Sequence, residues 1–80
     1  MRILGNDCNY RHFKGGEYHI VCIATHTETG ETLVIYRDVH DYGAVYARPY
    51  DMFAGKVDKE KYPDATQEYR FEEIWEDNHG

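Results

Sequence analysis

Four of the five arginines in this sequence stand within two residues of an aromatic ring, and this pairing is the clearest sign of binding chemistry. A guanidinium group can hold a carboxylate or a phosphate through two parallel hydrogen bonds, and it can also stack on an aromatic face. If the two residue types converge, a tyrosine ring can stack on a base while an arginine holds the phosphate. We therefore predict a ligand-binding surface made of Tyr10, Arg11, His12, Tyr36, Arg37, Tyr46 and Arg48.

The arginines also have a structural interpretation, because the chain is acidic overall. Its 80 residues include 15 Asp and Glu against 9 Lys and Arg, which gives a formal net charge of −6. Each arginine could therefore pair with a surplus carboxylate and cover an aromatic edge with its stem. Arg70 precedes the acidic C-terminal residues and fits this alternative best, so it is left out of the predicted surface.

The charge balance also limits the kind of ligand. Sequence-independent binding of duplex DNA draws its affinity from a basic surface, which a net charge of −6 does not predict. We expect a non-catalytic module that binds a small anionic ligand, such as a nucleotide, or a single-stranded nucleic acid. The alternative is a protein-interaction or homo-oligomeric assembly domain, in which the aromatic residues are buried against a protein partner or a second copy of the chain.

Catalytic and metal-binding patterns are weak by comparison. The chain has no serine, and a thiolate pair of Cys8 with His12 lacks a predicted rigid scaffold. His26 and Glu28 are further acid–base candidates, but a hydrogen bond across a hairpin turn is the structural alternative for His26. Cys22 and His26 would lie about 13 Å apart on a straight strand, too far to share one zinc ion. No catalytic residue, metal site or cofactor is therefore predicted, and an enzymatic role is the least supported hypothesis.

Length and composition describe one small domain. Eighty residues leave no room for a second core, and no segment approaches the roughly 20 apolar residues that a membrane-spanning helix needs. The first residues lack the apolar core of a secretory signal. We therefore expect a cytoplasmic protein with no membrane contact and with reduced thiols. A single Cys8–Cys22 disulfide is the alternative.

Hydrophobic alternation predicts strands over most of the chain. Residues 17–26 give the clearest strand, with Ile20 and Cys22 on one face and apolar residues on the other face too, as in the centre of a sheet. Gly30 ends a hairpin turn, and a partner strand follows over 31–37. Further strands are predicted over residues 44–48, 54–57 and 68–75, the last with a short helix as the alternative.

These strands predict an all-β fold. We expect a small bent antiparallel sheet or a partly open SH3-like barrel of about five strands, capped by a short helical turn. Met52 and Phe53, in a tight corner after Pro49, are expected to plug its end, and the alternative is a hydrophobic docking corner. The predicted organisation is an irregular lead-in over 1–9, one β domain over 10–75 and a frayed acidic tail over 76–80.

An ordered set of short motifs runs through most of the chain. These are Tyr10-Arg11-His12-Phe13-Lys14-Gly15, Ala24-x-His26-x-Glu28-Thr29, Val34-x-Tyr36, Arg48-Pro49 with Met52-Phe53, and Arg70-Phe71. Together they resemble the DUF1653 family, short bacterial proteins of unassigned function. That family often has Trp where Tyr46 stands, so an aromatic wall is retained here. The resemblance implies a compact, mainly β domain and brings no catalytic residues with it.

Overall fold

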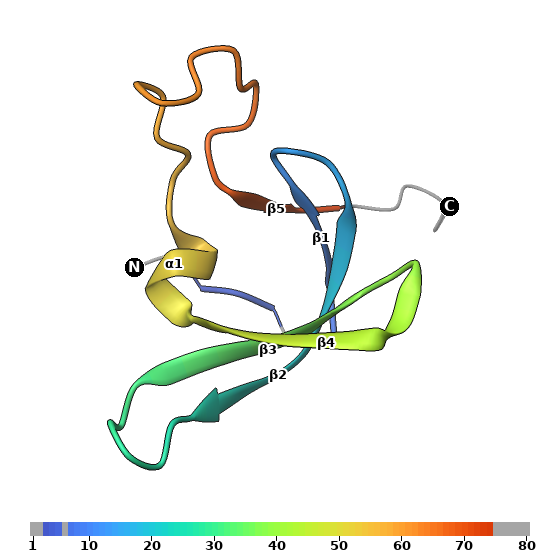
Figure 1. Ribbon diagram of the computed structural model, residues 1–80, viewed down its shortest axis with the longest axis vertical. Coiled ribbons are helices and arrows are strands. Elements are labelled where there is room, and N and C mark those ends of the chain that lie inside the picture. The colour runs from blue at the N-terminus through green and yellow to red at the C-terminus, as the bar shows by residue number, and fades with distance from the viewer. Residues whose placement is uncertain (1–2, 6, 75–80) are drawn as a thin grey trace.

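Five antiparallel strands in one open sheet and a single short helix make up the fold (Figure 1). The computed structural model describes residues 3–5 and 7–74, so the predicted tail over 76–80 lies outside the described residues. The sheet order is β4-β3-β2-β1-β5. The elements are β1 (Asn9–His12), β2 (Glu17–Thr25), β3 (Thr32–Asp38), β4 (Asp41–Pro49), α1 (Tyr50–Ala54) and β5 (Phe71–Glu73). The expected β-rich class with about five strands is confirmed.

The turns between the first strands depend on glycines with left-handed backbone angles. Gly15 and Gly16, with φ values of 105° and 91°, connect β1 to β2. Gly30, with φ 77°, closes the β2–β3 hairpin, where its N–H donates to the His26 carbonyl over 2.8 Å. A side chain would strain such a backbone, which is the physical reason that the turn predicted at Gly30 is confirmed.

One predicted element is wrong. Residues 54–57 do not form a strand, because α1 runs to Ala54 and only Lys56 makes a single bridge, to Tyr69. The lead-in over 1–9 contains no helix or strand in its described residues before Asn9, which begins β1, and its Leu4 is buried in the core. Over 68–75 the strand prediction is right rather than the helix, but only for the three residues of β5.

A bulge in β2 changes which of its residues face inward. Ile20 pairs with Tyr36 and Ile23 pairs with Val34, so one extra residue of β2 is accommodated between these pairs. Ile20 and Ile23 therefore share the inner face although they are three residues apart. Cys22, which simple alternation placed beside Ile20, is exposed instead.

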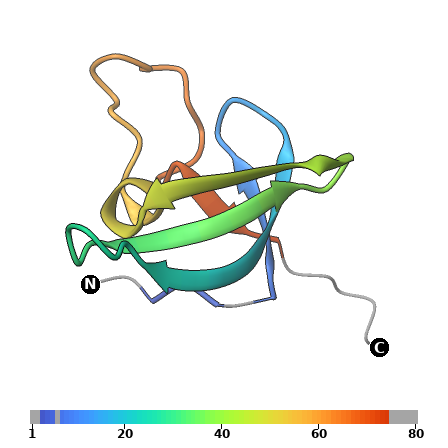
Figure 2. The ribbon, with the colours of Figure 1, turned by 60° about the horizontal axis from the view of Figure 1, so that its bottom comes forward.

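The sheet curls around an aromatic core (Figure 2). Phe53 of α1 lies on the ring of Phe71 from β5, with centroids 4.0 Å apart and planes within 7° of parallel. Phe53 is fully buried, whereas Met52 is 50% exposed, so the expected plug consists of Phe53 alone. No helix of the described residues is long and apolar enough to cross a membrane. The buried core cluster is Leu4, Tyr10, Ile20, Val34, Tyr36, Phe53 and Phe71.

Candidate binding site

The sheet register separates the predicted binding residues onto two faces. Tyr36 pairs with Tyr46 and faces the core, so the next residue, Arg37, points to the outer face. Arg11 is exposed and follows the buried Tyr10, which places it on the outer face as well. Arg48, two residues after Tyr46, shares the inner face. The seven predicted residues therefore do not form one surface.

Arg48 is the arginine that the inner face holds in position. Its Nε donates a hydrogen bond to the Tyr36 hydroxyl over 3.2 Å. Its guanidinium carbon lies 5.4 Å from the centroid of the Phe71 ring, within cation–π range. No Asp or Glu of the described residues forms an ion pair with Arg48. The side chain is thus oriented by aromatic groups while its charge is not neutralised by a described carboxylate.

Two further tyrosine rings pack around Tyr36, the hydrogen-bond partner of Arg48. Tyr36 lies 5.5 Å from Tyr46 and 5.6 Å from Tyr18, measured between ring centroids. Burial, reinforced by Asp38, raises the pKa of Tyr18, so its hydroxyl stays neutral and can donate a hydrogen bond. Tyr46 is 45% exposed and can stack on an incoming ring. Tyr10 is only 1% exposed, so it supports the face from below and cannot touch a ligand.

His12 lies beside Arg48 on the same face. Its ring packs 4.7 Å from Phe71, and its Nδ1 accepts a hydrogen bond from the Lys14 backbone N–H over 3.1 Å. Burial lowers the pKa of His12, and the positive charges of Arg48, Lys14 and Arg70 lower it further. His12 is therefore neutral at pH 7, with its proton on Nε2. The shift also reveals a positive field at this point of an acidic chain.

The sequence prediction missed a second group of residues next to His12. Phe13 lies 5.0 Å from Tyr62, between ring centroids, and the Nζ atoms of Lys14 and Lys61 lie 4.7 and 5.5 Å from the Tyr62 centroid. The sequence does contain a signal for this group, because Lys61 stands directly before Tyr62 just as the arginines stand beside their aromatic residues. Arg70 has the structural role expected of it, since its Nη1 donates to the Met52 carbonyl over 3.0 Å.

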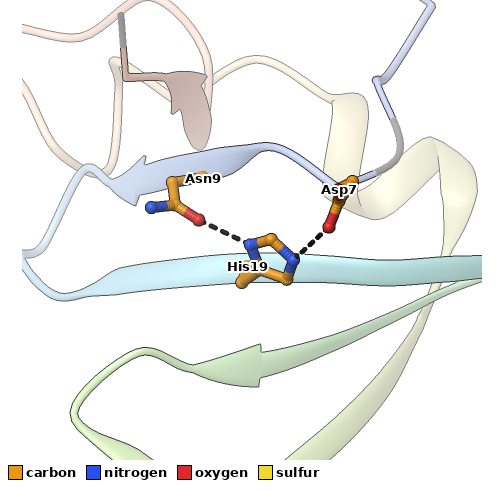
Figure 3. Close-up of polar contacts among 3 residues, drawn as sticks. All are labelled: Asp7, Asn9 and His19. Atoms are coloured by element: carbon orange, nitrogen blue, oxygen red, sulfur yellow. Dashed lines mark hydrogen bonds and ion pairs between the residues drawn. The ribbon is translucent and has the colours of Figure 1, made fainter. Parts of the chain in front are cut away.

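Arg37 belongs to a separate groove of about 570 Å³ at one end of the sheet. There the ring nitrogens of His19 lie 2.6 Å from Asn9 Oδ1 and 2.9 Å from Asp7 Oδ1 (Figure 3). Because both nitrogens are engaged, His19 has none free to act as a general base in this arrangement. The groove is lined by Asp7, Cys8, Asn9, His19, Arg37, Val39, Glu73 and Ile74.

The two thiols and His26 lack catalytic geometry. Burial raises the pKa of Cys8, as do the nearby charge of Glu73 and its hydrogen bond, which keeps the group a weakly nucleophilic thiol. Cys8 and Cys22 are not joined by a disulfide, which contradicts the disulfide alternative. His26 Nδ1 accepts from the Glu28 N–H over 3.1 Å, which confirms its structural role in the turn. The described residues contain no group of three or more potential metal ligands.

Comparison with known proteins places the whole β domain in one family. The family model described as a protein of unknown function (DUF1653) matches residues 8–73, from the residue before β1 to the end of β5. No curated protein and no solved structure gives a significant match. The matched segment contains the inner-face tyrosines, Arg48 and His12, and it covers most of the chain. The chain therefore belongs to the DUF1653 family.

Proposed function

We propose that this protein is a non-catalytic binding module in which Arg48 holds the anionic part of a ligand. The proposal rests on one observation: the Arg48 guanidinium is held in position but has no acidic partner. Tyr36 and Phe71 fix its position, yet no described carboxylate pairs with it. In a chain with more acidic than basic residues, such a cation is well suited to an anion from outside.

The surroundings of Arg48 favour an anion that carries a ring. Tyr46 offers an exposed aromatic face on the same strand, and Tyr18 offers a hydroxyl donor. A nucleotide or a single-stranded nucleic acid supplies both a phosphate and a base, so it matches this combination. Arg11 and Arg37, on the outer face, are not part of the proposed site.

We place this activity in the cytoplasm. Two cysteines that form no disulfide, one of them exposed, suit a reducing compartment. An exposed thiol would be oxidised more readily outside the cell. Nucleotides and single-stranded nucleic acids are also abundant in the cytoplasm. The bacterial setting of this proposal rests on the family resemblance alone.

Replacing Arg48 by alanine is expected to weaken anion binding about ten- to hundredfold. A hydrogen bond to a charged group contributes about 1.5–3 kcal/mol, and the guanidinium is the closest cation in the proposed site. We would titrate the wild-type protein, Arg48→Ala and Arg11→Ala with thymidine monophosphate and inorganic phosphate by calorimetry. Arg11→Ala removes the same charge from the outer face and should bind like the wild type. Equal affinities for all three proteins, or no binding by the folded wild type, would rule the proposal out.

A second candidate function, homo-oligomeric assembly, is favoured by the open edge of β4. This edge strand is nine residues long, whereas β5 at the opposite edge has only three. None of the described β4 side chains is buried, and Val45 is 56% exposed. Residues 43–47 carry no charge that would discourage pairing with another strand.

Sedimentation velocity over a range of concentrations tests this second function. Assembly through β4 predicts a dimer that dissociates on dilution and that disappears when Val45→Lys places a charge on the edge. The matched control is Val21→Lys, because Val21 is also exposed but lies on the central strand β2. A monomer at every concentration, or a dimer that tolerates Val45→Lys, would remove β4 assembly from consideration.

A further inference from the structure

The inner face continues beyond Arg48 into a line of aromatic rings with cations at both ends, which we call the basic aromatic row. From this row we infer that the ligand is a single-stranded nucleic acid several nucleotides long, rather than a mononucleotide. The inference rests on the proposed function, because Arg48 is one end of the row. Its members are Arg48, Phe71, His12, Phe13, Tyr62, Lys14 and Lys61.

Each member of the row contacts the next at about the same spacing. Phe71 lies 5.4 Å from the Arg48 guanidinium carbon and 4.7 Å from His12, measured from its ring centroid. His12 lies 4.8 Å from Phe13, which in turn lies 5.0 Å from Tyr62. Phe71 is only 1% exposed and supports the row from below, whereas His12, Phe13 and Tyr62 are partly exposed. A single base can cover one ring, so these three rings offer more stacking positions than a mononucleotide can occupy.

Two segments distant in sequence build the far end of the row. Figure 2 shows the turn between β1 and β2 beside the long loop over residues 55–70, and Phe13 and Tyr62 meet there. The Phe13 N–H donates to the Arg70 carbonyl over 2.9 Å, which ties the turn to the chain entering β5. Across the base of the loop, the Val57 N–H donates to the Glu68 carbonyl over 2.9 Å. The loop thus presents Tyr62 from a hydrogen-bonded base.

The cations of the row are available to phosphates. Lys14, Lys61 and Arg48 form no ion pair with any described Asp or Glu. Lys56, outside the row, shows the contrast, because its Nζ lies 3.4 Å from a carboxylate oxygen of Glu68. A row of unpaired cations in a chain of net charge −6 is the arrangement that neutralises successive phosphates along one strand.

The same features favour a single strand over a duplex. The rings of the row can stack only on bases that are not already stacked inside a double helix. A duplex also presents two charged backbones, which would meet the acidic remainder of this protein at close range. The row is therefore suited to one strand that runs from the β1–β2 turn to β4.

The experiment compares ligand lengths on the complete protein. Fluorescence anisotropy would measure binding of labelled oligothymidylate and oligouridylate octamers, with thymidine monophosphate and an eight-base-pair duplex as unlabelled competitors. We expect the octamers to bind at least tenfold more tightly than the monophosphate or the duplex. The DNA and RNA octamers separate the two sources of a single strand, and preference for either supports the inference.

Variants at the far end of the row separate this inference from the proposed function. Tyr62→Ala and Lys14→Ala should each weaken octamer binding about three- to tenfold and leave monophosphate binding unchanged. Because Lys14→Ala removes about one phosphate contact, it should also reduce the slope of log affinity against log salt concentration by about one. Lys56→Ala, which removes an ion-paired lysine, is the matched control and should bind the octamer like the wild type.

The possible failures are distinguishable. If octamer and monophosphate bind with equal affinity and neither Tyr62→Ala nor Lys14→Ala changes binding, the inference from the row is wrong. The proposed Arg48 site would not be affected by that result. Duplex binding as tight as octamer binding would also overturn it. If neither octamer nor monophosphate binds to protein that thermal unfolding shows to be folded, the inference and the proposed function fail together.

Discussion

Phe53→Ala is expected to lower the free energy of unfolding by about 3–5 kcal/mol, the usual cost of truncating a buried phenylalanine. Phe53 is the one fully buried residue of α1, and Tyr50 and Ala54 of the same helix pack against the core as partly buried residues. Phe53 stacks on Phe71 and meets the edges of Tyr36 and Tyr10 at centroid distances of 5.1 and 5.5 Å. Its loss would leave a cavity between the helix and three strands.

The effect is large because the domain is small. At about 0.05–0.15 kcal/mol per residue, a chain of this length has a total stability of about 4–12 kcal/mol. Urea unfolding followed by circular dichroism would measure the change. Met52→Ala is the control, since it alters the neighbouring residue of α1 at a half-exposed position and should cost far less. Similar losses for the two variants would contradict the packing described for α1.

Ligand binding is expected to become tighter as the pH falls, through His12. In the free protein, burial and three nearby cations lower the pKa of His12. A bound phosphate offsets the repulsion from those cations, so it raises this pKa and the complex takes up a proton. Affinity should rise about tenfold for each unit by which binding raises the pKa.

The free energy of unfolding of the ligand-free protein should change with pH in the opposite direction. Because the folded pKa of His12 is the lower one, the unfolded chain binds the proton more readily. The contribution of neutral His12 is therefore complete above the unfolded value of about 6.5, and it is lost as the pH falls towards the folded value. Acid thus loosens the free protein while it tightens the complex.

Calorimetry at pH 5.5, 6.5 and 7.5 would test the binding prediction. The wild-type protein and His12→Gln would each be titrated with the thymidylate octamer, and only the wild type should show the increase at low pH. His40→Gln is the matched control, because His40 is an exposed histidine on the β3–β4 turn. A flat wild-type profile, or a pH dependence that survives in His12→Gln, would show that His12 does not couple proton uptake to binding.

The β2–β3 hairpin is the part of the fold that the sequence predicts best. Its strands combine hydrophobic alternation with a turn whose glycine requires a left-handed backbone, and both signals are local. β1 has no such signal, because its four residues are mostly polar. It becomes a strand through pairing with β2 on one side and β5 on the other, which no local pattern encodes.

Only the part of the candidate site that follows local strand alternation could be predicted from the sequence. Tyr36, Tyr46 and Arg48 follow strand alternation, and that alternation already places Arg37 on the opposite face. The contact of Phe13 with Tyr62 joins a turn to a distant loop, so it depends on tertiary structure. The predicted strand over 54–57 failed because burial of Phe53 favours a helical turn there over extension.

The pairing of β5 with β1 also determines when the binding face exists. β5 is the last strand of the described chain, and its Phe71 is the ring on which both Arg48 and Phe53 lie. Contacts between segments so far apart in sequence form slowly. On the ribosome, the hairpins of β2, β3 and β4 emerge before this ring does. The surroundings of Arg48 are therefore incomplete until β5 has been synthesised, and the proposed ligand would bind only after β5 has paired with β1.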